Sequence, residues 1–161
     1  MRNRQVIGAV ALVALAGCML VPSRAVAAPV KTAAELVAAV KGAQEGDIIE
    51  LAEGTFEVDA TIELKGKMTL KGAGIGKTTL THTEKWKPST KALPDPEMTL
   101  DGLDTDAYLI RIKRDTSGVT IADMTLKCQQ LHGAIFAWFH KDLHLHHLRI
   151  QETLYSGVRT F

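Results

Sequence analysis

The segment Val119–Leu126, VTIADMTL, is matched 24 residues later by Leu143–Ile150, LHLHHLRI, and every apolar position of one meets an apolar position of the other. The alignment continues forward to Gly133 against Gly157. It also runs backward and places Ile110 and Ile112 over Ala134 and Phe136. A period in the twenties that is made of short strands and turns is typical of a solenoid, whose units bury their inner faces on their neighbours.

Each repeat is predicted to hold three short strands that stack in parallel on the next coil. In the best-defined coil these strands are Ala134–Trp138, Leu143–Leu145 and Leu148–Ile150. Leucine-rich repeats share the period, but their recurring Leu and Asn framework is absent. No second helical pattern follows the one at the N-terminal end, which excludes βαβ folds. The predicted class is therefore all-β, a parallel β-helix.

One short helix precedes the strands, at about residues 33–43. Thr32 and Glu35 form a capping box, in which each side chain can accept a hydrogen bond from the other residue's backbone. Leu36, Val37 and Val40 follow at helical spacing. We expect this helix to cover the first coil, because an open β-helix end exposes unpaired strand groups.

Three stretches resemble the pectate-lyase-like superfamily of right-handed parallel β-helices: Ala33–Ala60, Met68–Leu80 and Ser117–Leu126. The first has the helix, Gly-Asp, strand and Gly-Thr-Phe order with which many such proteins open. The likeness covers residues 31–161 and implies a right-handed coil and a protein that binds or processes a polysaccharide, as a lyase, hydrolase or epimerase. No family motif can be matched residue by residue, so the catalytic residues stay unknown.

Residues 28–161 are predicted to be the N-terminal part of this domain, so that the β-helix is incomplete at its C-terminus. In the 24-residue register, Gly157–Phe161 stands where Gly133–Ala137 begins a new coil. Two alternatives to a polysaccharide-active protein stay open. One is a non-enzymatic surface scaffold or adhesion module, and the other is an inactive truncated fragment.

Residues 1–27 have the features of an export signal. Two arginines precede the apolar run Val6–Val21, and Ala25-Val26-Ala27 offers a small-x-small cleavage site. A competing interpretation is a lipobox at Leu15–Cys18, with Cys18 lipidated. Both predict a periplasmic, extracellular or cell-surface protein that meets a membrane only through a lipid anchor at Cys18.

The charge balance argues against a nucleic-acid partner. The chain has 19 basic and 18 acidic side chains, and loss of the three arginines in residues 1–27 leaves 16 basic against 18 acidic. Gly72–Thr78, GAGIGKT, mimics a phosphate-binding loop. However, Lys71 stands where that motif requires glycine, and a strand rather than a helix is predicted to follow. No nucleotide is expected.

Two arginines are candidate substrate-binding residues. If Ile110, Ala134 and Val158 point inward, Arg111, Ile135 and Arg159 form an outward column, and Lys113, Ala137 and Phe161 form the next. Arginines two coils apart stand near 10 Å from each other and suit uronic-acid carboxylates. In the insertion loop at about 84–106, Trp86 is a third candidate, either stacked on a sugar ring or packed on the coil as a loop anchor.

Metal binding rests on two weak patterns. Asp101, Asp104 and Asp106 cluster at the end of the insertion and suit calcium, with a polar loop as the alternative. Calcium is therefore the possible cofactor of this loop. The histidines near the C-terminus offer a second pattern, typical of zinc ligands, in which His144 and His146 share one strand face, with a solvated outer face as the alternative. These histidines are His140, His144, His146 and His147.

Overall fold

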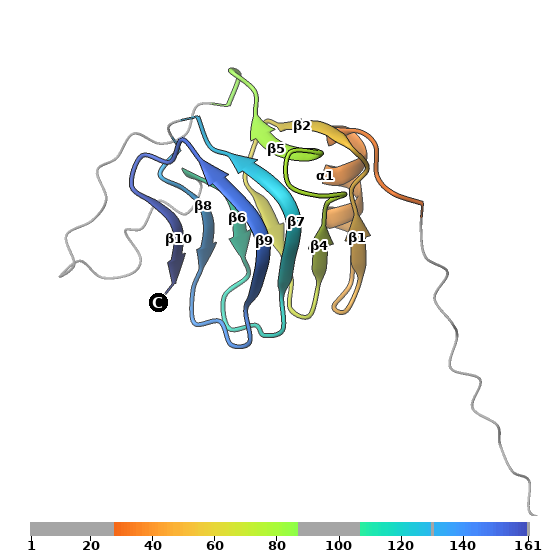
Figure 1. Cartoon of the computed structure of the whole chain (residues 1–161). Coiled ribbons are helices and arrows are strands. Elements are labelled where there is room, and N and C mark those ends of the chain that lie inside the picture. Colours follow the sequence, from red (N-terminus) through yellow and green to blue (C-terminus); the bar gives the residue numbers. More distant parts are fainter. Residues whose placement is uncertain (1–27, 87–106, 130, 161) are drawn as a thin grey trace, which may run out of the picture.

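Short parallel strands wind into four stacked coils behind one helix in the computed structural model, which describes residues 28–86, 107–129 and 131–160 (Figure 1). Every strand pair among these residues is parallel, and the right-handed parallel β-helix predicted from the sequence is confirmed. In chain order the strands are β1 (Ile48–Glu50), β2 (Gly54–Val58) and β3 (Ile62–Leu64); β4 (Thr69–Lys71), β5 (Thr78–His82) and β6 (Tyr108–Ile112); β7 (Thr120–Lys127) and β8 (Gly133–Ala137); β9 (His144–Gln151) and β10 (Ser156–Thr160).

The later two coils have two long strands, because β7 and β9 each bend instead of breaking. The first half of β7 pairs with β4 and its second half pairs with β5, so one strand serves two sheets. The bends lie at Asp123 and His147, whose φ angles are 56° and 50°. Asp and His are among the residues that tolerate this left-handed conformation best. We call the arms the first sheet (β1, β4 and the starts of β7 and β9) and the second sheet (β2, β5 and the ends of β7 and β9).

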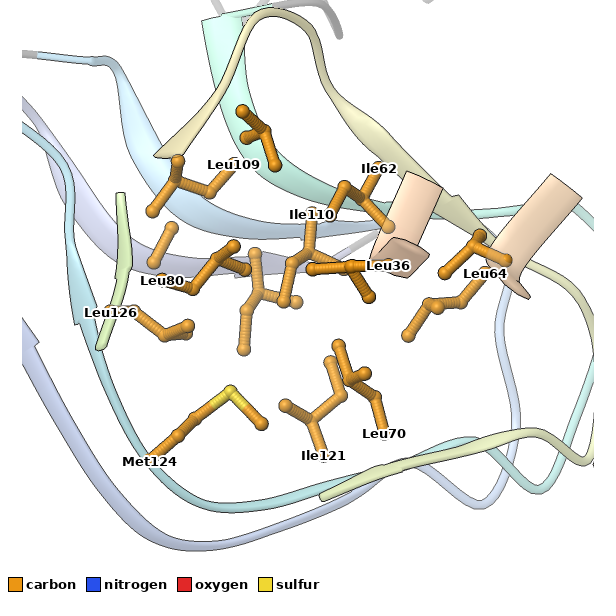
Figure 2. Close-up of a cluster of buried hydrophobic side chains, with 14 of the residues drawn as sticks. Leu36, Ile62, Leu64, Leu70, Leu80, Leu109, Ile110, Ile121, Met124 and Leu126 are labelled. Carbon is orange, nitrogen blue, oxygen red and sulfur yellow. The ribbon is translucent and has the colours of Figure 1, made fainter. Parts of the chain in front are cut away.

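The third sheet has the order β3, β6, β8, β10. Each sheet contributes columns of apolar side chains to a common core, which Figure 2 shows in part. Apolar residues of one coil pack on those of the next, so that no single coil has to enclose a core of its own. One column from each sheet is Ile49, Leu70, Ile121 and Leu145; Phe56, Leu80, Leu126 and Ile150; and Ile62, Ile110, Ile135 and Val158.

The predicted register holds on the first two sheets and is wrong on the third. Thr120 pairs with His144 and Leu126 with Ile150, which is the predicted offset of 24 residues. Ile110 pairs with Ile135 instead of Ala134, and Ile135 pairs with Val158. The offsets here are 25 and 23 residues, because β8 is displaced by one residue along the chain. The turn before β8 (128–132) is one residue longer than the turn before β10 (152–155), and the turn after β8 (138–143) is one residue shorter than the turn after β6 (113–119). A shift of one residue moves every side chain of a strand to the opposite face.

The N-terminal helix α1 (Ala33–Gly42) lies against β1, β2 and β3, the strands of the first coil (Figure 1). Its predicted capping box is present: Thr32 Oγ1 accepts from Glu35 N at 3.1 Å, and Glu35 Oε2 accepts from Thr32 N at 3.3 Å. Leu36 is fully buried and Val40 is 7% exposed, but Val37 is 49% exposed, so its predicted place on the buried face is wrong.

Residues 1–27 and most of the insertion loop lie outside the described residues. The predicted export signal, the lipidation site at Cys18 and the calcium candidates Asp101, Asp104 and Asp106 all fall there. Within the described residues, no helix is both long and apolar enough to cross a bilayer.

Candidate functional site

The outer face of the third sheet brings the two predicted arginines into one column. Arg111 pairs with Phe136 on one side, and Phe136 pairs with Arg159 on the other. The residue between the arginines is therefore Phe136, and its prediction as Ile135 was wrong. The predicted second column also fails, because Ala137 pairs with Ile112 and not with Lys113. Arg111 and Arg159 remain two coils apart, at about 10 Å between backbones.

Glu63 occupies the same column one coil before Arg111. Two nitrogens of the Arg111 guanidinium contact one oxygen of this carboxylate: Nη2 lies 2.8 Å and Nε lies 3.0 Å from Glu63 Oε2. The side chains are 31% and 45% exposed. This pair holds the arginine head on the surface of the sheet and offsets part of its charge.

A ladder of six aromatic rings crosses the same face. Consecutive ring centroids are 5.1, 6.4, 5.1, 6.1 and 6.0 Å apart, within the range in which rings attract edge to face or tilted. Three of them, Tyr108, Phe136 and Trp138, form a second buried apolar cluster that is distinct from the main core. In order, the rings belong to Tyr155, His132, Tyr108, Phe136, Trp138 and Phe139.

The middle of this aromatic ladder is buried and its two ends face solvent. Phe136 is 1% exposed, whereas Tyr155 is 52% and Phe139 is 45% exposed. At the Phe139 end, the Arg114 guanidinium carbon stands 5.0 Å from the centroids of both Trp138 and Phe139. Such cation–π contacts fix the arginine over the rings. The face therefore offers two exposed rings, one at each end, and a guanidinium group at the Phe139 end.

One column of the third sheet carries buried hydroxyl groups. Tyr108 and Ser156 both pair with Gly133, and a Cβ on Gly133 would lie only 2.5 Å from Tyr108 Cε1. The glycine thus makes room for the tyrosine ring. Tyr108 Oη and Ser156 Oγ are buried, and neither has a hydrogen-bond partner among the described residues. Buried polar atoms in this state are uncommon in folded proteins.

Trp86, the third predicted substrate-binding residue, lies elsewhere. Its indole is 9% exposed, belongs to the main core and packs edge-on against His82 with 5.3 Å between ring centroids. This position corresponds to the second interpretation, a loop anchor packed on the coil.

The glycine-rich stretch that mimics a phosphate-binding loop is a turn between strands. β5 begins at Thr78, where a nucleotide-binding protein has a helix. Lys77 pairs instead with Glu53, at 2.7 Å between Nζ and Oε1, and this hydrogen bond raises the pKa of Lys77.

Cys128 offers no reactive thiolate. The residue is fully buried at the end of β7, and burial, helped by the charge of Glu152, raises the pKa of its thiol to about 12. The thiol is therefore a packing group, as expected of a lone cysteine in a core.

The histidines are brought together in a way that the sequence pattern did not predict. His144 and His146 are both exposed on the outer face of β9, as predicted. The nearest partner of His146 is nevertheless His147, with 3.0 Å between their Nδ1 atoms. His140 stands apart, and its Nδ1 lies 3.0 Å from Thr116 Oγ1.

No family model matches the chain. The curated proteins include none with detectable sequence similarity to it.

The sequence pattern does not predict the aromatic ladder, although it contains one signal of it. IFAWF, residues 135–139, places bulky apolar residues on both faces of one strand, and a strand with one face toward solvent alternates instead. Reading Phe136 as an inward residue hid this signal. Sequence spacing alone offers no means of joining Tyr108 and Tyr155 to the group.

Proposed function

We propose that this chain is an exported β-helix protein that binds an acidic polysaccharide on the outer face of its third sheet. The observation that carries the proposal is the aromatic ladder with arginines beside it, exposed at Tyr155 and Phe139. Aromatic rings stack on the C–H faces of sugar rings, and guanidinium groups pair with uronate carboxylates.

The spacing of the positive groups supports a polymer rather than a single sugar. Arg111 and Arg159 repeat with the period of the coils, and Arg114 lies at the Phe139 end of the aromatic ladder. A chain with one carboxylate per residue can engage several of these groups together.

The resemblance of residues 31–161 to the pectate-lyase-like superfamily supports a carbohydrate ligand and extends the proposal to lyase, hydrolase or epimerase chemistry. Incubation with polygalacturonate or alginate, followed by sizing of the polymer and measurement of unsaturated ends, separates these activities from binding alone. Bound polymer that stays intact favours the surface scaffold.

Export is supported by the basic start, the apolar run and the small-residue site within residues 1–27. Mass spectrometry of protein recovered outside the cytoplasm is expected to find Ala28 as the first residue, or a lipidated Cys18. Recovery there of chains that retain Met1–Ala27 would contradict the proposal.

The binding test uses isothermal titration calorimetry with polygalacturonate and alginate, and a neutral glucan as the comparison polymer. Tyr155→Ala, Phe139→Asn and Arg114→Gln are each expected to weaken binding, by about fivefold for a lost stacking or charge contact. Asparagine is chosen at position 139 because Phe139 has φ 47°, which asparagine tolerates.

Two matched controls lie away from this face. Val37→Ala removes an exposed apolar group from α1, and Arg149→Gln removes an exposed arginine from the second sheet. Both are expected to bind like the parent chain. Failure to bind any acidic polymer, or equal losses in the control variants, would overturn the proposal.

A further inference from the structure

The bends of β7 and β9 stack on one another and bring three metal-binding side chains together. Ala122 pairs with His146 and Met124 with Leu148, so Asp123 lies opposite His147 in the next coil. Both bend residues have positive φ, 56° and 50°, which turns their side chains away from the regular alternation of the strand. The result is a cluster of Asp123, His146 and His147 on the outside of the coil corner.

Two of the distances in this cluster are close to those of atoms that share one cation. His146 Nδ1 and His147 Nδ1 are 3.0 Å apart, and His147 Nδ1 and Asp123 Oδ1 are 3.3 Å apart. One ligand atom from each residue lies within 4.8 Å of the other two. With metal–ligand bonds of about 2.0–2.1 Å, neighbouring atoms of a tetrahedral zinc site are about 3.3 Å apart.

Hydrogen bonds among these three side chains would leave some of their lone pairs without a partner. His147 Nδ1 lies within hydrogen-bond reach of His146 Nδ1 and close to the Asp123 carboxylate, yet one nitrogen carries at most one proton. A divalent cation at the centre satisfies all three lone pairs at once. Because the His147 side chain is 73% exposed and that of Asp123 27%, the remaining coordination positions are open to water or to an outside ligand.

We infer that Asp123, His146 and His147 form a binding site for a divalent transition-metal ion, with zinc as the reference ion. Two imidazoles and one carboxylate suit borderline ions, whereas calcium and magnesium prefer sites made of oxygen alone. The site is independent of the proposed polysaccharide face, because it lies where the first sheet meets the second. It joins two coils, so a bound ion also ties β9 to β7.

The test is calorimetric titration of the untagged, full-length chain with zinc chloride at neutral pH, where one equivalent is expected to bind saturably. His146→Ala and His147→Asn are each expected to weaken binding by about tenfold or more. Asparagine at positions 147 and 123 keeps the left-handed backbone accessible. His144→Ala is the matched control, because His144 is exposed on the same strand and outside the cluster.

Two further readouts separate coordination from adventitious binding. Cobalt(II) is expected to give the visible absorption of a four-coordinate ion, and His146→Ala abolishes it. Zinc, but not calcium, is expected to raise the melting temperature of the parent chain and not that of Asp123→Asn. Absence of saturable zinc binding would overturn the site. So would a folded His146→Ala/His147→Asn double variant that binds zinc as tightly as the parent chain.

Discussion

Arg111 and Arg159 stand on one outward column of the third sheet because the backbone of Phe136 pairs with both strands that carry them. At a separation of about 10 Å in water, two positive charges repel by only about 0.4 kcal/mol, so the column tolerates them. The arrangement costs the fold little and presents positive groups with the period of the coils.

The ion pair between Arg111 and Glu63 predicts that substitutions of its two residues change the affinity for polygalacturonate in opposite directions. Arg111→Gln is expected to weaken binding of polygalacturonate about fivefold, because it removes a positive group from the face. Glu63→Gln is expected to strengthen binding about threefold, because the carboxylate at 2.8 Å no longer competes for that arginine. Calorimetry measures both. Glu57→Gln, an exposed change on β2, is the control, and a fall in affinity for Glu63→Gln would contradict this account.

The helix α1 covers the first coil mainly through Leu36. Leu36→Ala is expected to lower the free energy of unfolding by about 2–5 kcal/mol, because its side chain is fully buried in the core. Val37→Ala, next to it but 49% exposed, is expected to change this free energy by less than about 0.5 kcal/mol. Urea unfolding followed by circular dichroism measures both, and equal effects would show that the helix does not dock as described.

Gly133 is required by the close approach of Tyr108 and the backbone of the next coil. Gly133→Ala is expected to destabilise the chain by about 1–3 kcal/mol, since the new methyl group would meet the Ser156 carbonyl oxygen and Tyr108 Cε1. Gly42→Ala meets nothing within 4 Å at the end of α1 and is expected to be neutral or stabilising by up to about 1 kcal/mol. Thermal melts rank the two variants, and the reverse order would refute the packing of Tyr108 on Gly133.

His140 is expected to make the turn before β9 acid-sensitive. Its Nε2 lies 3.5 Å from Val119 N and can accept from it, while Nδ1 contacts Thr116 Oγ1. Burial lowers the pKa of His140, and the charge of Asp142 opposes this only in part. The unfolded chain therefore binds this proton more readily, so the contribution is present above the unfolded pKa of about 6.5 and is lost as pH falls.

Proton NMR is expected to find the pKa of His140 below that of an unfolded histidine. The denaturation midpoint of His140→Gln is expected to fall less between about pH 7.5 and about pH 5.5 than that of the parent chain. His144→Gln serves as the exposed control. Equal acid sensitivity in the parent and His140→Gln would show that this histidine does not contribute.

The fold could be predicted from the sequence because its signals are local or strictly repeated. The capping box that begins α1 needs only Thr32 and Glu35, and both of its hydrogen bonds are formed. The stacking of β7 on β9 follows from the match between Val119–Leu126 and Leu143–Ile150. Apolar residues recur there at equal spacing, and burying them on one another leaves a single register.

Only the tertiary structure decided what lies on the surface of those coils. The turns Cys128–His132 and Glu152–Tyr155 differ in length by one residue. This difference exchanges the inner and outer faces of β8 compared with those that a constant 24-residue period predicts. Phe136 rather than Ile135 therefore stands between Arg111 and Arg159. The positive φ of His147 likewise turns its side chain toward Asp123 of the preceding coil. Neither effect can be read from spacing, because each depends on how a short turn closes against neighbours that are distant in sequence.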